Sequence, residues 1–211
     1  KRVVLSRELS FEEIKSIREN CPDVELKVFI HGAQCYGFSG LCLASQKITG
    51  RSANGGECAQ ICRTWFHSKE TGEDKYFFSM KDMSIGEKVK DYVNLGLDSL
   101  KIEGRMKSPQ YVYNCALYYS LLINGPSEDE DKVKWAKEAM EIAFSRYPSK
   151  GFFDSGNKGP RTEENLMYRD FPSHLGVQVG TIEKVLQNKA VVKFSKPVAL
   201  RDGIRVLFNG K

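Results

Sequence analysis

The chain has 211 residues, of which 41% are hydrophobic, 28% are charged and six are cysteine. This composition supports a folded core and excludes collagenous and wholly disordered proteins. Its best apolar stretch, residues 115–123, is far shorter than the ~20 residues of a membrane span, and charged sequence follows the N-terminus at once, without a secretory signal. We therefore expect a cytoplasmic protein with no membrane span.

The net charge of +5 is concentrated near the C-terminus. Residues 176–211 contain seven lysines and arginines but only two acids, so the charges of the rest of the chain balance. Such an asymmetry favours a polyanionic partner such as RNA. An ordinary solvated basic face is the alternative, because aromatic residues are not interleaved with these charges.

Strands and helices are predicted alternately along most of the chain. We expect strands at residues 3–5, 24–30, 76–80 and 98–102, and helices that begin at Ser10, Ser84, Ser108 and Ser127. Three of these serines have a glutamate three residues later, the spacing of a capping box, and Ser108 is followed by proline. Cys21 and Cys115 lie on apolar helix faces and are expected to be buried.

This order of elements predicts an α/β fold with a parallel sheet, because each crossover returns the chain to the same end of the sheet. Four such units are half of a (β/α)8 barrel. We expect residues 1–145 to be the C-terminal half of a TIM-like barrel, 146–175 a linker and 176–211 the start of a small basic β domain, with a turn at Asp202-Gly203. A parallel half-barrel has two open edges, so the other half is expected from a missing segment or a partner subunit.

Four of the six cysteines, Cys35, Cys42, Cys58 and Cys62, lie within 28 residues. Without a secretory signal, such a group favours metal or redox chemistry over disulfides. Four thiolates bind zinc or an iron–sulfur cluster. Only Cys58 and Cys62 have the close spacing of a zinc knuckle, and the wide spacing on a glycine-rich loop suits a larger cluster. Zinc and unligated core thiols stay open as alternatives.

Polar residues follow the predicted strands at the end where barrel enzymes place their active sites. His31 follows the second strand, and Glu103 and Arg105 follow the fourth, which contains Lys101. We predict that these four side chains bind or polarise a substrate. The alternatives are a histidine that only fixes a loop, a structural ion pair between Glu103 and Arg105, and a structural role for Lys101.

At these residues the sequence resembles the peptidase U32 family, the collagenase-like proteins. The motifs that carry the resemblance are residues 28–35 (VFIHGAQC), 39–42 (SGLC), 50–63 (GRSANGGECAQICR) and 97–109 (LDSLKIEGRMKSP), with an earlier one at 7–10 (RELS). The sequence departs from the family at Gly55, where arginine is common, and at Ile61, where proline is common.

The resemblance implies an oxygen-independent RNA hydroxylation enzyme, since better-understood members hydroxylate a tRNA uridine or an rRNA cytidine, with prephenate as a metabolic requirement. It assigns a 4Fe–4S cluster to the four clustered cysteines, with Arg51 and Asn54 as candidates for binding the cofactor. The family name offers a collagenase-like peptidase as the alternative, with Cys35 as nucleophile and His31 as base. A zinc-stabilised, non-catalytic RNA-binding module is a further alternative.

Overall fold

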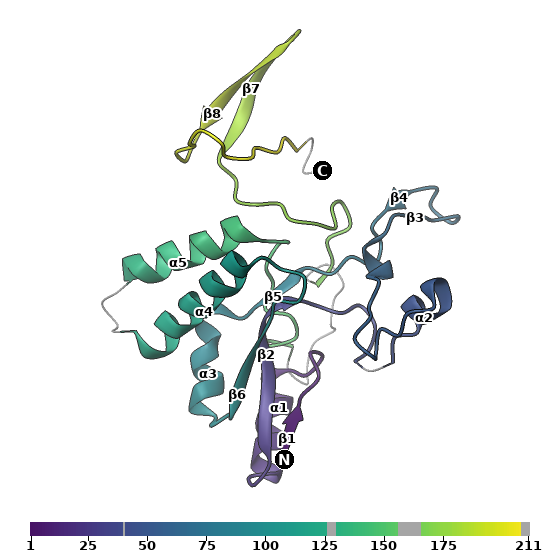
Figure 1. Cartoon of the computed structure of the whole chain (residues 1–211), viewed down its shortest axis with the longest axis vertical. Coiled ribbons are helices and arrows are strands. Elements are labelled where there is room, and N and C mark those ends of the chain that lie inside the picture. The colour runs from purple at the N-terminus through teal and green to yellow at the C-terminus, as the bar shows by residue number, and fades with distance from the viewer. Residues whose placement is uncertain (40, 126–129, 156–165, 208–211) are drawn as a thin grey trace.

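A four-stranded sheet covered by helices organises the first part of the chain (Figure 1). The structure, a computed structural model, describes residues 1–39, 41–125, 130–155 and 166–207. The elements of the sheet domain are β1 Arg2–Val4, α1 Phe11–Asn20, β2 Glu25–Ala33, α2 Ala44–Thr49, β3 Phe66–His67, β4 Asp74–Lys75, β5 Asp82–Ser84, α3 Val89–Asn94, β6 Ser99–Glu103, α4 Pro109–Asn124 and α5 Glu130–Ala143. β7 Gly180–Leu186 and β8 Lys189–Phe194 follow.

β2 is the central strand of the sheet. It pairs in parallel with β6 along one edge. On its other edge it pairs in parallel with β1 near its start and antiparallel with β5 near its end, where Ala33 lies opposite Asp82. The fold is therefore mixed α/β with parallel strands, as predicted, but the described strands form no closed barrel.

The predicted strand at residues 76–80 is wrong, because this segment bonds elsewhere. The Tyr76 N–H donates to the Arg169 carbonyl (3.0 Å), and the Tyr168 N–H donates to the Ser79 carbonyl (2.9 Å). The strand that joins the sheet is β5, a few residues later and antiparallel to β2. The backbone groups of residues 76–80 thus form hydrogen bonds with residues that are distant in sequence.

The larger of the two hydrophobic clusters among the described residues lies between the sheet and the helices. Leu26, Val28 and Ile30 of β2 are each at most 2% exposed, and burying a side chain of this kind contributes about 1.5–3 kcal/mol. The helices supply Ile14, Val89, Tyr92, Cys115, Tyr119, Ala136 and Met140. The alternate residues of β2, Lys27 and Phe29, are only partly buried, so the opposite face of the sheet is more open.

The capping chemistry at two helix starts is confirmed. The Ser10 hydroxyl accepts from the Glu13 N–H (3.3 Å), and the Glu13 carboxylate accepts from the Ser10 N–H (2.7 Å). Ser108 caps α4 by accepting from the Tyr111 N–H (3.2 Å), and Pro109 is the first residue of that helix. These interactions are contained within a single turn, which is why the local sequence predicts them.

The other two predicted helix starts have different outcomes. Ser84 lies in β5, where it pairs with His31, and the 3-10 turn Gly86–Lys88 precedes α3, so a capping box at Ser84 is wrong. The capping box predicted at Ser127 lies outside the described residues.

Cys115 is fully buried, as predicted, whereas Cys21 is exposed. Cys21 is the C-cap of α1, where the backbone has already left the helix. The helical periodicity that placed it on the apolar face therefore no longer holds at this position.

Part of the segment predicted as a linker packs on the sheet domain. Arg146 forms a buried ion pair with Asp82, Ser149 bridges to Met83, and Phe153 is part of the core. These contacts fix the segment beside the carboxyl end of β2.

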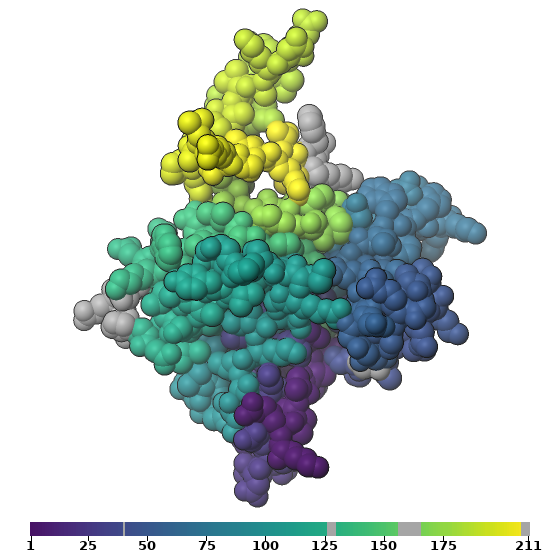
Figure 2. Space-filling model, viewed as in Figure 1, coloured from purple at the N-terminus to yellow at the C-terminus, as the bar shows by residue number. Residues whose placement is uncertain are grey.

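β7 and β8 form an antiparallel hairpin that projects away from the sheet domain (Figures 1 and 2). Its two-residue turn is Gln187-Asn188. Asp202 closes a later turn, in which its carboxylate accepts from the Ala199 N–H (2.7 Å). Among the described residues, no helix is long and apolar enough to cross a membrane.

Candidate functional site

The loop that carries the four clustered cysteines begins at the carboxyl end of β2. Cys35 lies two residues beyond that strand. The loop then continues through α2 and ends at the 3-10 turn Ile61–Arg63, which contains Cys62. The Glu8 carboxylate accepts from the Ser39 N–H and hydroxyl at 2.9–3.0 Å. Ser45 of α2 accepts from the Ala59 N–H (3.0 Å). The first contact ties the loop to the segment after β1, and the second closes the loop on itself. Figure 2 shows this segment (blue) as a lobe beside the domain.

All four thiols are free and influence one another electrostatically. Burial raises the pKa of Cys35, and the neighbouring Cys42 and Cys58 raise it further. Burial likewise raises the pKa of Cys62, and each of the other three thiols adds to the effect. The loop therefore brings all four cysteines into one neighbourhood.

The four thiols have the donor chemistry of a thiolate-bound metal centre. Their mutual influence on pKa shows that they share one region of the loop. Within the part of the chain that the structure describes, however, no three histidine, cysteine, aspartate or glutamate side chains converge closely enough to hold a metal ion. The four cysteines fit a metal or cluster by residue type and neighbourhood, but not by the positions of their side chains in this structure.

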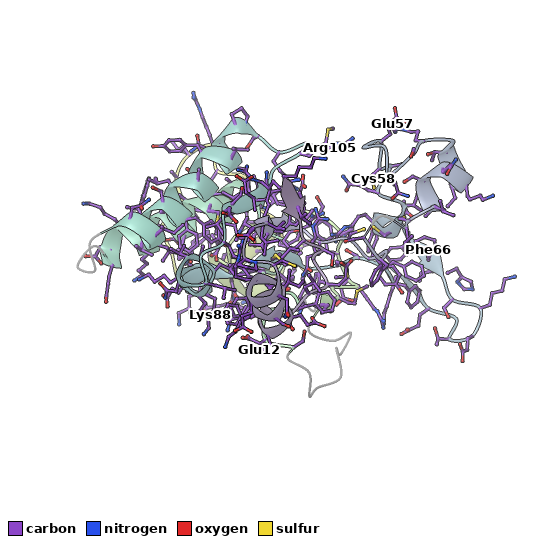
Figure 3. All side chains as sticks on the ribbon, turned by 90° about the horizontal axis from the view of Figure 1, so that it is seen from below. Glu12, Glu57, Cys58, Phe66, Lys88 and Arg105 are labelled. Atoms are coloured by element: carbon purple, nitrogen blue, oxygen red, sulfur yellow. The ribbon has the colours of Figure 1, made fainter. Side chains whose placement is uncertain are left out.

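Three arginines lie near the thiols. Arg7 lowers the pKa of Cys35, and Arg63 lowers that of Cys62, although burial outweighs both effects. Arg105 lies on the side of the sheet domain that faces loop residues Glu57 and Cys58 (Figure 3). Such positive charge stabilises thiolates and any anionic metal–thiolate centre. Sequence reasoning named Arg105 but missed Arg7 and Arg63, although Arg7 lies in one of the quoted motifs and Arg63 directly follows Cys62.

Lys101 and Glu103 lie together on the open face of the sheet. The Lys101 ammonium is 4.7 Å from the centre of the Phe29 ring, and the Arg7 guanidinium is 3.7 Å from it. Arg7 also pairs with the Glu103 carboxylate (3.3 Å). Arg105 contributes only its backbone N–H to Glu103 (3.3 Å), so these two side chains form no ion pair.

His31 faces the helices instead of this open face. Its Nδ1 lies 3.2 Å from the Tyr119 hydroxyl, which donates to the Ile30 carbonyl (3.0 Å). The register between β2 and β6 shifts by one residue between Phe29 and His31, which turns His31 toward α4. Burial lowers the pKa of His31 to about 4, so it is neutral at physiological pH.

The two predicted cofactor-binding residues, Arg51 and Asn54, are exposed in the turn that follows α2. His31 and Cys35 form no hydrogen bond in the described structure, because the His31 Nδ1 faces the Tyr119 hydroxyl. The nucleophile–base pair of a peptidase is therefore not formed.

Large apolar side chains are exposed around the cysteine loop. Tyr36 is 47% exposed, Phe38 63% and Trp65 55%. Exposed aromatic rings of this kind provide stacking surfaces for unpaired bases. Sequence reasoning did not identify these rings, because the sequence alone does not show which aromatic side chains are exposed.

Residues 1–163 match the family model described as peptidase family U32. The chain is 32% identical over 220 aligned positions to the 23S rRNA 5-hydroxycytidine C2501 synthase of Escherichia coli K12, an alignment that covers 98% of this chain and 33% of that protein. It is 38% identical over 151 positions to tRNA hydroxylation protein P1 of Bacillus subtilis 168, which covers 66% of this chain and 36% of that protein.

A collagenase of Porphyromonas gingivalis W83 is 31% identical over 215 positions, which cover 92% of this chain and 49% of that protein. The chain thus spans between about a third and a half of the length of these relatives. No solved structure matches the chain at a significant level.

Proposed function

This chain belongs to peptidase family U32, and from this premise we propose that it is an RNA hydroxylation protein whose four clustered cysteines bind a 4Fe–4S cluster. Two relatives are named for the hydroxylation of tRNA and 23S rRNA. The observation that carries the proposal is the group of four free, mutually influencing thiols beside Arg7, Arg63 and Arg105.

A bound cluster would supply electron transfer, and the protein's own residues would position the RNA. Cys35, Cys42, Cys58 and Cys62 would hold the cluster. Lys101 and Glu103 would contact the reacting base from the open sheet face, with Arg105 between that face and the loop. Arg51 and Asn54 stay candidates for cofactor binding, and a requirement for prephenate is part of the same proposal.

RNA binding has support from two surfaces. The exposed aromatic rings Tyr36, Phe38 and Trp65 surround the cysteine loop and would stack on unpaired bases. Most residues of the hairpin β7–β8 are exposed, and it carries Lys184, Lys189 and Lys193, which would neutralise phosphates. A cytoplasmic location accords with an RNA substrate.

A barrel half is the proposed context of the sheet domain. Helices cover one face of the sheet, and the other face carries Phe29, Lys101 and Glu103, as the inner face of a barrel would. The relatives are about two to three times as long as the aligned segment. Further strands, from a longer form of the chain or from a partner subunit, would then complete the barrel.

The test is anaerobic purification followed by metal, sulfide and absorption measurements. The proposal predicts iron and sulfide in equal amounts together with the visible absorption of an iron–sulfur cluster. Cys58→Ala and Cys62→Ala are each expected to lose the cluster, whereas the exposed Cys21→Ala keeps it. A colourless protein with stoichiometric zinc would overturn the cluster proposal and favour the zinc-stabilised module.

A separate assay addresses the peptidase alternative. If Cys35 were a protease nucleophile, Cys35→Ala would abolish collagen or gelatin cleavage while Cys58→Ala left it intact. The cluster proposal predicts the same outcome for both variants, which is loss of RNA hydroxylation together with loss of iron. Hydroxylation is measured by mass spectrometry of RNA incubated with the reconstituted protein.

A further inference from the structure

Three cations gather around one carboxylate at the carboxyl end of β2. Arg146 Nε and Nη2 donate to Asp82 Oδ1 at 2.9 and 2.5 Å, and both side chains are less than a tenth exposed. This pair is balanced in charge. Two further cations lie nearby: Arg63 donates to the carbonyl of Met80, two residues before Asp82, and Lys107 lies over the same Phe144 ring as Arg146.

Among the described residues, the groups that hydrogen-bond to Arg63 are all neutral. Its Nη1 donates to the Ser79 hydroxyl (2.9 Å) and to the Met80 carbonyl, and its Nη2 donates to the Gln34 carbonyl (3.4 Å). Among the residues that the structure describes, no carboxylate lies within salt-bridge distance of Arg63. Its charge is therefore held in position but left without an ion-pair partner there.

Lys107 likewise has no ion-pair partner among the described residues. Its ammonium lies 2.9 Å from the centre of the Phe144 ring, and the Arg146 guanidinium lies 5.2 Å from that ring. Partial burial, together with the charges of Arg146 and Arg63, lowers the pKa of Lys107 to about 8, while the Asp82 carboxylate opposes the shift. No acid within the described ranges pairs with Lys107.

Gln34 adds an independent observation. The residue is 4% exposed, and its side-chain Oε1 is buried without a hydrogen-bond partner in the described structure. Its Nε2 donates to the Ser149 hydroxyl (3.2 Å). A buried polar atom without a partner costs about 1–3 kcal/mol unless a ligand or water satisfies it. If the terminal amide is turned by 180°, Oε1 accepts from Ser149 and the amide nitrogen is free to donate to a ligand.

We propose that Arg63, Lys107 and Arg146 form a binding site for an oxyanion, a phosphate or carboxylate group. The three cations exceed the single Asp82 carboxylate by two positive charges, which repel each other in a partly desolvated place. An anion bound among the three cations relieves that repulsion. The anion comes either from a small free molecule or from the RNA backbone. The site does not require metal on the cysteines, so its test is independent of the test of the proposed function.

The experiment titrates the protein with inorganic phosphate and follows the melting temperature against sodium chloride of equal ionic strength. The wild type is expected to show a saturable rise in melting temperature that chloride does not produce. Lys107→Met is expected to weaken phosphate binding by at least about tenfold, and Lys107→Arg is expected to retain it. Lys107→Gln replaces the methionine variant if that variant does not fold.

Lys88→Met is the matched control. Lys88 also lies over an aromatic ring, that of Phe153 (5.9 Å), but it pairs with Asp91 (3.3 Å) and lies outside the cation group. The Lys88→Met variant is expected to bind phosphate as the wild type does. An equal phosphate response in the wild type, Lys107→Met and Lys88→Met would overturn the site, as would no response in any of them.

Competition identifies the source of the anion. If a single-stranded RNA oligonucleotide displaces phosphate from the wild type and binds Lys107→Met more weakly, the natural anion is an RNA phosphate. If RNA binds without displacing phosphate, the site takes a small free oxyanion. Either result supports the site.

Discussion

Arg7 Nη2 lies 3.3 Å from Glu103 Oε2 and connects the two outer parallel strands of the sheet. Arg7 follows β1, Glu103 ends β6, and β2 lies between them. The guanidinium crosses the open face of β2 above the Phe29 ring, at 3.7 Å from its centre. A cation and a carboxylate are thereby fixed beside the cysteine loop.

Removing this ion pair is expected to cost stability. Arg7 and Glu103 are about one-fifth exposed, so Arg7→Met is expected to lower the free energy of unfolding by about 1 kcal/mol. A double-mutant cycle with Glu103→Gln in urea denaturation measures the coupling. Arg2→Met is the control, because the Arg2–Glu25 pair is about half exposed and is expected to show no measurable coupling. Equal coupling in both pairs would contradict this account.

Stability is expected to fall in acid because of His31. The pKa of His31 is about 4 in the folded protein and 6.5 when unfolded, so the unfolded state binds the proton first. The stabilisation is complete above pH 6.5 and declines as the pH falls toward 4, by about 2 kcal/mol at pH 5. Urea denaturation at pH 7 and pH 5 is expected to show a smaller loss in His31→Asn than in the wild type.

His67→Asn is the control for this measurement. His67 is more than half exposed and lies 3.0 Å from Asp74. Its replacement is expected to leave the loss of stability between pH 7 and pH 5 close to that of the wild type. If His31→Asn and the wild type lost stability equally, the histidine would not be the group responsible.

The buried pair Asp82–Arg146 is expected to be sensitive to loss of one partner. Asp82→Asn leaves a buried guanidinium without its carboxylate and is expected to cost about 3–5 kcal/mol. The double variant Asp82→Leu with Arg146→Met is expected to be more stable than the single variant, because it also removes the guanidinium that the single variant leaves without its carboxylate. Asp154→Asn breaks the exposed pair with Lys150 and serves as the control in thermal denaturation.

Gly32 is expected to tolerate no side chain. Its φ is +110°, and a Cβ there would collide with the Glu103 carbonyl across the β2–β6 pair. Gly32→Ala is expected to destabilise the protein by more than about 2 kcal/mol, since strain and steric overlap add. Gly72 also has a positive φ (+68°) but open space around it, so Gly72→Ala is expected to cost less. Chemical denaturation of both variants measures the difference.

The exposed aromatic rings are expected to bind RNA by stacking. Trp65→Ala is expected to weaken the binding of a single-stranded RNA by about tenfold or more, since one stacked base contributes about 1–3 kcal/mol. Trp135→Ala on α5 is the matched control, because this tryptophan is equally exposed but lies on another element. Fluorescence anisotropy measures both affinities, and equal affinities would argue against RNA at the loop.

Several features of the protein follow from the sequence alone because their causes are local. The capping box of Ser10 and Glu13 and the cap at Ser108 act within one helical turn. The apolar run of α4 buries Cys115 as expected. The family motifs also lie in continuous segments, so the four cysteines and the family are recognisable without a structure.

The tertiary structure decided which face, edge and partner each residue takes. Alternation along β2 would place His31 beside Phe29, but the register shift against β6 turns it to Tyr119. Residues 76–80 leave the sheet because the backbone near residue 168 competes for them. Arg7 meets Glu103 across 96 positions of sequence. Such pairings depend on the free energy of contacts between distant segments, which local composition and periodicity do not contain.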